Sequence, residues 1–279
     1  MTSCAPVSRA ATLRRVTERV DSALAARGLA RSRTHAAKLI AEGLVTVDGV
    51  PVVKPSIPVA ADQSVEVAGQ DHYVSRAAHK LIAGLDAFEV PVAGRLALDV
   101  GASTGGFTQV LLERDARLVI SLDVGHGQLV EELRADRRVV VVEGCNARYL
   151  DADALAEASG VPERPDLVVA DLSFIPLGIV LPALVATSLE GSDFVLLVKP
   201  QFEVGRSGVR EGIVRDPGLR EDAVSAVLWA AWDLGLRTAG VIASPIAGGS
   251  GNREYLVHLS AAVGDDPGSW RDTIARLTA

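Results

Sequence analysis

Between residues 96 and 259 the sequence alternates short apolar segments with amphipathic ones, and no other feature constrains the fold as much. Seven apolar segments are short and rich in Val, Leu and Ile, which is typical of strands buried on both faces of a sheet. They are Leu96–Val100, Leu118–Asp123, Val139–Glu143, Leu167–Asp171, Phe194–Lys199, Thr238–Ser244 and Tyr255–Leu259. The alternation predicts an α/β fold with a parallel, doubly wound sheet that binds ligands outside the carboxyl ends of its strands.

A glycine-rich turn follows the first apolar segment. Residues 99–107 read Asp-Val-Gly-Ala-Ser-Thr-Gly-Gly-Phe, and Phe107 begins an amphipathic helical pattern. Small residues in such a turn let the backbone approach a nucleotide-like ligand, although glycines also serve close packing alone. The dinucleotide pattern Gly-x-Gly-x-x-Gly is not matched, because Ser103 stands at its third position. The turn resembles the S-adenosylmethionine loop of class I methyltransferases instead.

Polar residues stand at the ends of the other predicted strands. Asp123 ends the second, about one crossover after the turn, where an acidic side chain can bind ribose hydroxyls. Asn146 follows the third and is a candidate for the adenine edge. Asp171 ends the fourth strand, Lys199 ends the fifth, and Glu254 precedes the last. A lysine that ends a buried strand is costly unless its charge has a partner or a task, so a structural ion pair is the alternative to a catalytic role.

The first 80 residues have a different character from the rest of the chain. They carry 11 Lys and Arg against 7 Asp and Glu, while the whole chain has a net charge of −7. A helical pattern begins at Val16 and stops at Gly28, and a second helix follows an N-cap at Ser32. Asp48-Gly49 is a hairpin turn signal between two short strands. This basic segment indicates an anionic partner.

The segment resembles the S4-type RNA-binding domain, a small α+β fold. The matching strings are Arg19-Val-Asp-x-x-Leu24, Gly28-Leu-Ala-x-Ser-Arg33, Ile40-x-x-Gly43-x-Val-x-Val47-Asp-Gly49 and Lys54-Pro55. The resemblance implies contacts with the RNA phosphate backbone. The candidate RNA-binding residues are Arg19, Arg27, Arg31, Arg33, Lys38, Lys54 and, in the next helix, Arg76. A lid whose arginines are merely solvated is the alternative.

Four residues in the order Lys80, Asp171, Lys199 and Glu254 resemble the tetrad of the FtsJ-like ribose 2′-O-methyltransferases. Together with the S4-type segment, the chain resembles the TlyA family. The strings that carry this resemblance are Val74-Ser-Arg-x-x-His-Lys-Leu81, Leu98-Asp-x-Gly-Ala-Ser-Thr-Gly-Gly-Phe107, Asp123-Val-Gly-x-Gly-Gln-Leu129, Asn146-Ala-Arg148, Asp171-Leu-Ser-Phe-Ile175, Val198-Lys-Pro-Gln-Phe-Glu203 and Gly251-Asn-x-Glu-Tyr255. Departures are His126 in place of Tyr, Cys145 in place of Thr, and the wording of residues 71–74.

The resemblance implies methyl transfer from S-adenosylmethionine to the ribose 2′-hydroxyl of a cytidine in 16S or 23S ribosomal RNA, or in both. The implied partners are therefore ribosomal RNA or the 30S and 50S subunits. The implied cofactor-binding residues are Asp99, Gly101, Ala102, Ser103, Gly105, Gly106, Phe107, Asp123, Asn146 and Asp171. The implied domains are an S4-type domain at 16–68 and a Rossmann-like methyltransferase domain at 75–262. A disordered lead-in at 1–15, a linker at 69–74 and a helix or tail at 263–279 complete the expected division.

A ribose hydroxyl becomes a nucleophile only if its proton is removed and its oxygen is aimed at the methyl carbon. We expect Lys199 to be the base, in a neutral form favoured by burial and neighbouring positive charge. Asp171 would orient Lys199, while Lys80 and Glu254 would hold the hydroxyl or balance charge. Methylation of a base nitrogen is disfavoured because residues 171–174 read Asp-Leu-Ser-Phe and lack the Pro-Pro pair typical of that chemistry. Methylation at carbon 5 needs a nucleophilic cysteine, and Cys145 is expected to be a small buried thiol.

Other functions are disfavoured by what the sequence lacks. No apolar run reaches the roughly 18 residues of a membrane helix, which argues against a membrane-active hemolysin. Histidines at metal-binding spacing are absent, so we expect no metal site. Two cysteines in unrelated contexts predict a reducing, cytoplasmic setting. A non-catalytic RNA-binding or ribosome assembly factor stays open as an alternative, and the oligomeric state is not specified by the sequence.

Overall fold

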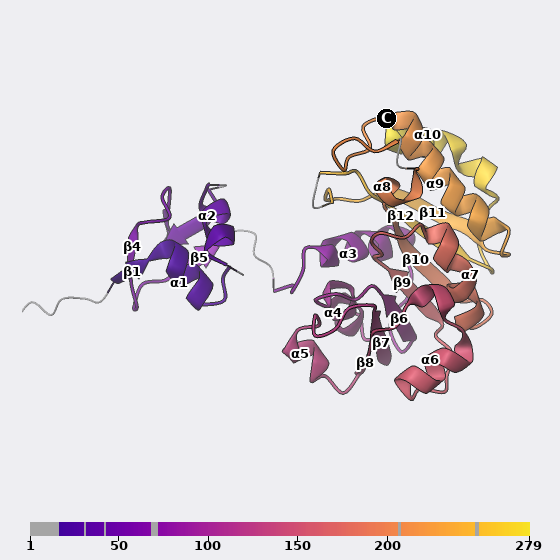
Figure 1. The fold of residues 1–279 in the computed structure, drawn as a ribbon, viewed down its shortest axis with the longest axis horizontal. Coiled ribbons are helices and arrows are strands. Elements are labelled where there is room, and N and C mark those ends of the chain that lie inside the picture. The colour runs from indigo at the N-terminus through magenta and orange to yellow at the C-terminus, as the bar shows by residue number, and fades with distance from the viewer. Residues whose placement is uncertain (1–16, 31, 42, 68–71, 206–207, 249–250) are drawn as a thin grey trace, which may run out of the picture. The chain divides into compact units, whose positions relative to one another are not determined.

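A computed structural model of the chain describes residues 17–30, 32–41, 43–67, 72–205, 208–248 and 251–279. The chain divides into two compact units, Met1–His72 and Tyr73–Ala279 (Figure 1). The predicted lead-in at 1–15 and residues 69–71 of the predicted linker lie outside the described residues.

The first unit packs two short helices against small antiparallel sheets. Its elements are β1 (Thr17–Arg19), α1 (Val20–Ala26), α2 (Arg33–Ala41), β2 (Val45–Val47), β3 (Val50–Pro51), β4 (Pro58–Ala60) and β5 (Val65–Val67). One sheet has the order β3-β2-β5, and β1 pairs with β4. The helical start expected at Val16 is wrong for residues 17–19, because their backbone pairs with β4 instead. Leu24, Ile40 and Val59 lie in the core of this unit.

Local sequence signals account for the turns of this unit. The Ser32 Oγ accepts a hydrogen bond from the His35 amide at 3.2 Å, as an N-cap of α2 does. Asp48 and Gly49 both have positive φ, at 48° and 78°, and Val47 pairs with Val50 across them. Two consecutive left-handed residues are what a two-residue hairpin needs, so the predicted turn is confirmed.

The second unit is built on a seven-stranded sheet of order β11-β12-β10-β9-β6-β7-β8. Its strands are β6 (Leu96–Val100), β7 (Leu118–Asp123), β8 (Val139–Glu143), β9 (Leu167–Ala170), β10 (Asp193–Val198), β11 (Arg237–Ala243) and β12 (Tyr255–Ser260). All seven predicted strands are present, within a residue or so at each end. The prediction of a wholly parallel sheet is wrong at β12, which is antiparallel to both β10 and β11. The chain passes from β11 to β12 without a crossover helix, and a direct connection reverses the strand direction.

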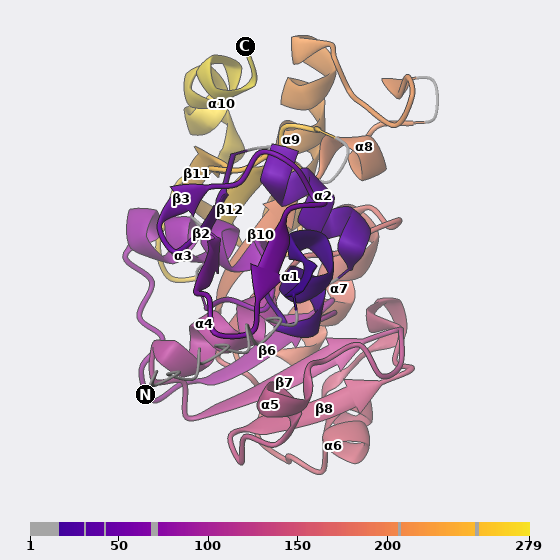
Figure 2. The ribbon, with the colours of Figure 1, turned by 90° about the vertical axis from the view of Figure 1, so that its left-hand side faces the viewer.

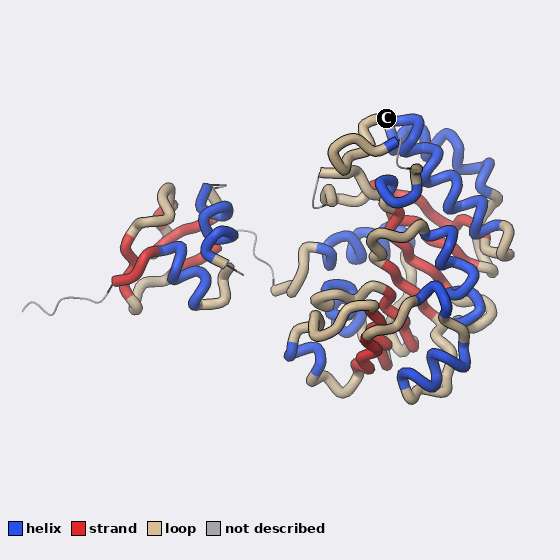
Figure 3. Tube along the Cα trace, viewed as in Figure 1, coloured by secondary structure: helices blue, strands red, loops and turns tan. Residues whose placement is uncertain are grey.

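Helices cover both faces of this sheet (Figures 1–3). One face carries α3 (Ala77–Phe88), α4 (Gly106–Glu113) and α5 (Glu131–Arg134). The other carries α6 (Ala152–Ser159), α7 (Leu177–Thr187), α9 (Pro217–Trp232) and α10 (Arg271–Thr278). The short helices η1 (Ala147–Tyr149), α8 (Pro200–Glu203) and η3 (Pro267–Trp270) lie in the connections. The unit is thus a three-layer α/β/α sandwich.

Side chains of the central strands alternate between the two apolar cores. In β10, Phe194, Leu196 and Val198 enter the core beneath α7 and α9, whereas Val195 and Leu197 enter the core beneath α3 and α4. A strand buried on both faces has no polar face, which explains why the sequence shows continuous apolar runs rather than alternation.

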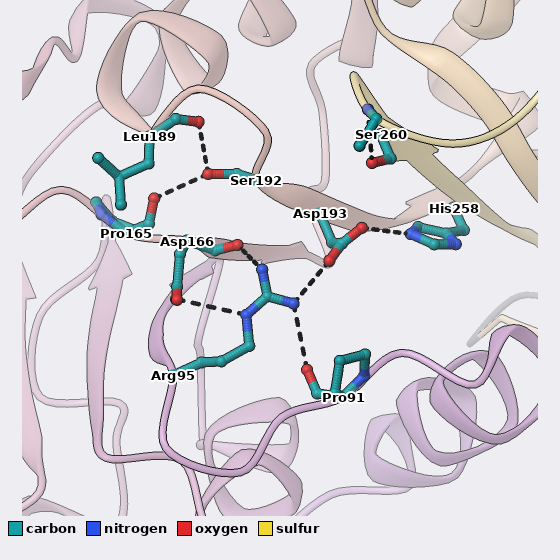
Figure 4. Close-up of polar contacts among 10 residues, drawn as sticks. Pro91, Arg95, Pro165, Asp166, Leu189, Ser192, Asp193, His258 and Ser260 are labelled. Atoms are coloured by element: carbon teal, nitrogen blue, oxygen red, sulfur yellow. Dashed lines mark hydrogen bonds and ion pairs between the residues drawn. The ribbon is translucent and has the colours of Figure 1, made fainter.

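A polar network ties four strands together at the amino ends of the parallel strands (Figure 4). Arg95, just before β6, donates to Asp193 Oδ2 at 2.7 Å and to the backbone oxygen of Asp166, which precedes β9. Asp193 begins β10, and its Oδ1 lies 2.9 Å from His258 Nε2 on β12. Burial tends to raise the pKa of Asp193, but its bonds to His258 and Arg95 outweigh this and lower it. The network fixes the strands at the edge opposite the predicted site.

Candidate active site

The predicted tetrad gathers at the carboxyl edge of β9 and β10. Asp171 follows β9 and Lys199 follows β10. Glu254 precedes β12, whose first residue pairs with the last residue of β10. Because β12 is antiparallel, its beginning lies at the same edge as the ends of its parallel neighbours. A parallel β12 would have carried Glu254 to the opposite edge.

The four side chains form two ion pairs. Lys80 Nζ lies 2.5 Å from Glu254 Oε2, and only 7% of Lys80 and 3% of Glu254 is exposed. Lys199 Nζ lies 2.5 Å from Asp171 Oδ1 and donates to Ser173 Oγ at 2.9 Å. Buried charges of this kind need a partner, and each lysine has a carboxylate. The site therefore holds two amines and two carboxylates in fixed positions beside a cavity.

The glycine-rich turn adopts backbone conformations that few residue types tolerate. Gly101, Ser103 and Gly105 have φ angles of 85°, 48° and 103°. A Cβ on Gly101 would lie 2.8 Å from the backbone oxygen of Asp171, so a side chain there would force β6 away from the loop after β9. The absence of a side chain at Gly101 lets the backbone after β6 lie close to the backbone of Asp171.

Asp123 organises the neighbouring loops. Its Oδ2 accepts from the Ser103 amide at 2.8 Å, and its Oδ1 accepts from the Gly125 amide at 2.7 Å. Ser103 Oγ donates to Gln128 Oε1 at 3.2 Å. Asp123 thus joins the turn after β6 to the loop after β7.

These loops enclose a cavity of about 480 Å³. Five predicted cofactor residues line it, namely Gly101, Ser103, Asp123, Asn146 and Asp171. The Asn146 side-chain oxygen accepts from the Arg148 amide at 3.0 Å. The sequence reading missed further lining residues, among them Val124, Gln128, Leu172, Ser173 and Phe174. All of these lie in the same loops as the predicted acids, and this proximity is the signal that could have found them.

The other five predicted cofactor residues support the turn and do not line the cavity. Gly106 permits close packing of α4 on the start of α3, because a Cβ there would lie 2.8 Å from Ser75 Cβ. Phe107 is buried in the core of that face. Ala102 and Gly105 complete the turn.

Asp99 is fully buried beneath the turn. Its Oδ2 accepts from Thr108 Oγ1 at 2.6 Å, and its Oδ1 has no hydrogen-bond partner. Burial raises the pKa of Asp99 to about 7, an effect that the Thr108 bond only partly opposes. Asp99 therefore supports the turn from below, and its assignment as a cofactor-binding residue stays a prediction.

Two aromatic rings stand beside the Lys199 pair. Phe174 is 91% exposed and has a φ of 66°, which is unusual for a bulky residue. Its ring centroid lies 5.1 Å from that of Phe202, and the Phe202 ring lies 6.0 Å from Lys199 Nζ. Both rings line a second, open hollow of about 570 Å³ together with Gln201, Val204 and Val209. An exposed aromatic in a strained conformation next to buried amines indicates a functional contact.

Three of the predicted RNA-binding residues, all arginines, bond to other groups of the first unit. Arg19 and Arg33 both pair with Asp21, and these hydrogen bonds lower the pKa of Asp21 to about 2. Arg27 donates to the backbone oxygens of Gln63 and Ala60, so it supports the fold of the first unit. Lys38, Lys54 and Arg76 are exposed. Arg31 lies outside the described residues.

Fold and site define the class of protein. A model of the FtsJ-like methyltransferases matches residues 73–261, and a model of the S4 domain matches residues 18–65. None of the described helices combines the length and the apolar character needed to span a bilayer. Within the described ranges, no three His, Cys, Asp or Glu side chains group as metal ligands.

Individual relatives narrow this class. The 16S/23S rRNA (cytidine-2′-O)-methyltransferase TlyA of Mycobacterium tuberculosis is 52% identical over 86% of this chain and 89% of its own. Hemolysin A of Brachyspira hyodysenteriae is 38% identical over 86% and 99%. A solved structure from Streptococcus thermophilus is 36% identical, with a TM-score of 0.74 and 94% of each chain covered. The chain belongs to the TlyA family of FtsJ-like methyltransferases.

Proposed function

We propose that this protein transfers the methyl group of S-adenosylmethionine to the ribose 2′-hydroxyl of a cytidine in 16S ribosomal RNA, 23S ribosomal RNA or both. The observation that carries the proposal is the pair of buried lysines, each held by a carboxylate, at the edge of the sheet beside the cavity. The name of the Mycobacterium tuberculosis relative supports the substrate. Such a substrate implies a cytoplasmic protein that meets ribosomal subunits.

The cavity has the features that a nucleoside cofactor needs. Its volume of about 480 Å³ falls in the usual range for small-molecule sites. The bare backbone at Gly101 allows close approach, the Asp123 carboxylate suits ribose hydroxyls, and the Asn146 amide suits the adenine edge. When bound, S-adenosylmethionine supplies a methyl group on a positively charged sulfur. We therefore assign Gly101, Ser103, Asp123, Asn146 and Asp171 as its contacts.

Lys199 is assigned as the base that takes the proton from the 2′-hydroxyl. Asp171 and Ser173 fix where its nitrogen points, and a base must be held within reach of the proton that it takes. Lys80 and Glu254 would hold the hydroxyl oxygen and balance the charge that develops on it. Fixing the nucleophile in line with the methyl carbon is itself a large part of the catalysis.

Phe174 and Phe202 are assigned to the target base. A ribose can reach buried amines only if its nucleotide leaves the RNA stack, and an extruded base needs an aromatic surface to replace its lost stacking. The exposed Phe174 ring offers such a surface next to Lys199. Lys38, Lys54 and Arg76 would contact phosphates elsewhere on the RNA.

Labelled methyl transfer to purified ribosomal subunits tests the proposal. Wild-type protein should label rRNA, and Lys199→Ala should abolish labelling while calorimetry still detects S-adenosylmethionine binding. Lys199→Arg is the matched control, because a guanidinium keeps the positive charge but does not act as a base. It should be as inactive as the alanine variant. Turnover in either variant refutes the assignment of Lys199, and absence of wild-type labelling favours a non-catalytic RNA-binding protein.

A further inference from the structure

The two loops that carry the Lys199 ion pair are held together at more than one place. The loop after β9, residues 171–176, supplies Asp171 and Ser173. The segment after β10, residues 199–204, supplies Lys199 and the short helix α8. Besides the Lys199 contacts and the ring pair of Phe174 and Phe202, one hydrogen bond joins their far ends. The Glu203 Oε1 accepts from the backbone amide of Leu177 at 2.9 Å.

This hydrogen bond replaces a missing helix cap. Leu177 begins α7, and the preceding residue, Pro176, has no side chain that can cap the helix. The first amides of a helix have no partner within it and carry a positive partial charge. A carboxylate from α8, 26 residues away in sequence, accepts from the first of these amides, at a helix start where no local side chain acts as a cap. The start of α7 is therefore set by the segment that bears Lys199.

Glu203 is not placed for stability alone. It is partly buried, and no cation pairs with it among the residues that the structure describes. Burial raises its pKa to about 7, against which the Leu177 amide acts. A carboxyl group without a counter-charge in such a place costs stability that a neutral side chain would not cost. A role at the neighbouring site accounts for its presence there.

We propose that Glu203 is a positioning residue that holds residues 171–176 against the Lys199 segment, so that Asp171 and Ser173 keep Lys199 Nζ aimed at the reacting hydroxyl. This inference rests on the proposed function. Glu203 does not itself line the S-adenosylmethionine cavity, so its loss should lower kcat by a larger factor than it weakens cofactor binding. A loop displaced by a fraction of an ångström is enough for a large rate effect.

Three substitutions of Glu203 separate the effect of its side-chain length from the effect of its charge. Glu203→Gln keeps an acceptor oxygen at the same distance, so kcat should stay near that of the wild type. Glu203→Asp keeps the charge but is one methylene too short, and Glu203→Ala removes the acceptor. Both should lower kcat about 10- to 100-fold, and the dissociation constant for S-adenosylmethionine should change by a smaller factor than kcat. Hydrogen exchange at the Leu177 amide should be faster in these two variants than in Glu203→Gln.

The matched control is Asp151→Ala, which removes the cap of α6, where Asp151 Oδ1 accepts from the Ala154 amide at 2.8 Å. It should lower the melting temperature and leave kcat unchanged. If Glu203→Ala does not fold, the kcat values of Glu203→Asp and Glu203→Gln test the proposal. An active Asp variant with an inactive Gln variant overturns the proposal, as does unchanged kcat in the Asp variant. Absence of methyl transfer by the wild type is a different outcome and refutes the proposed function, whereas the exchange rate at Leu177 is measured without any activity.

Discussion

Replacing Asp99 by Asn tests how this carboxyl group acts. Asp99 is fully buried, and its pKa rises from 3.8 to about 7, chiefly because burial disfavours the ionised form. In the unfolded chain the group ionises above about pH 4, whereas the folded protein retains the proton up to about pH 7. Between these values the folded state binds more protons, so the free energy of unfolding falls as pH rises.

The size of the effect follows from the pKa difference. A shift of about 3 units corresponds to roughly 4 kcal/mol at 1.36 kcal/mol per unit, which is an upper value for so buried a group. Asn is neutral throughout, so the Asp99→Asn protein loses this pH dependence. Relative to the wild type, its free energy of unfolding should rise by up to about 4 kcal/mol between pH 4 and pH 8.

Urea denaturation of both proteins across this pH range measures the difference, and all other titrating groups cancel in the comparison. Calorimetry at pH 8 should also show nearly unchanged affinity of Asp99→Asn for S-adenosylmethionine, because Asp99 lies beneath the turn. Asp123→Asn is the control, since its carboxylate lines the cavity and its loss should weaken binding. A stability difference that stays flat with pH would refute the reasoning about burial. Loss of affinity in Asp99→Asn would restore Asp99 as a direct ligand.

Two further substitutions test the turn and the opposite edge of the sheet. Gly101→Ala should lower the free energy of unfolding by about 2 kcal/mol more than Gly160→Ala, because both glycines have positive φ but only Gly101 meets a backbone atom. Equal losses in denaturant titrations would show that the contact with Asp171 relaxes freely. Arg95→Met should cost about 3 kcal/mol by leaving Asp193 without its guanidinium partner, with kcat per folded molecule unchanged. Arg117→Met, from an exposed pair with Glu163, should cost less than about 1 kcal/mol. A fall in kcat of fully folded Arg95→Met protein would contradict the separation of this network from the site.

Local patterns in the sequence were enough for the secondary-structure elements, and a family resemblance supplied the candidate residues of the site. A strand buried on both faces must be apolar along its whole length, which is why β6–β12 were located to within a residue or so. The Asp48-Gly49 hairpin followed in the same way from conformations that few residue types adopt. The order of Lys80, Asp171, Lys199 and Glu254 pointed to a candidate tetrad through its resemblance to the FtsJ-like methyltransferases.

The tertiary structure alone decided how these residues meet. Lys80 and Glu254 are 174 positions apart, and they pair only because β12 runs antiparallel to β10, a direction that the apolar pattern of a strand does not record. Burial of Asp99 and the cap that Glu203 provides for α7 depend likewise on which segments pack together. The periodicity of side chains along one helix or strand indicates which of its faces is buried. The charge state and orientation of a buried side chain depend on atoms of other elements that pack against it. The sequence therefore indicated the candidate residues of the site, and the packing of distant segments determined which of them touch.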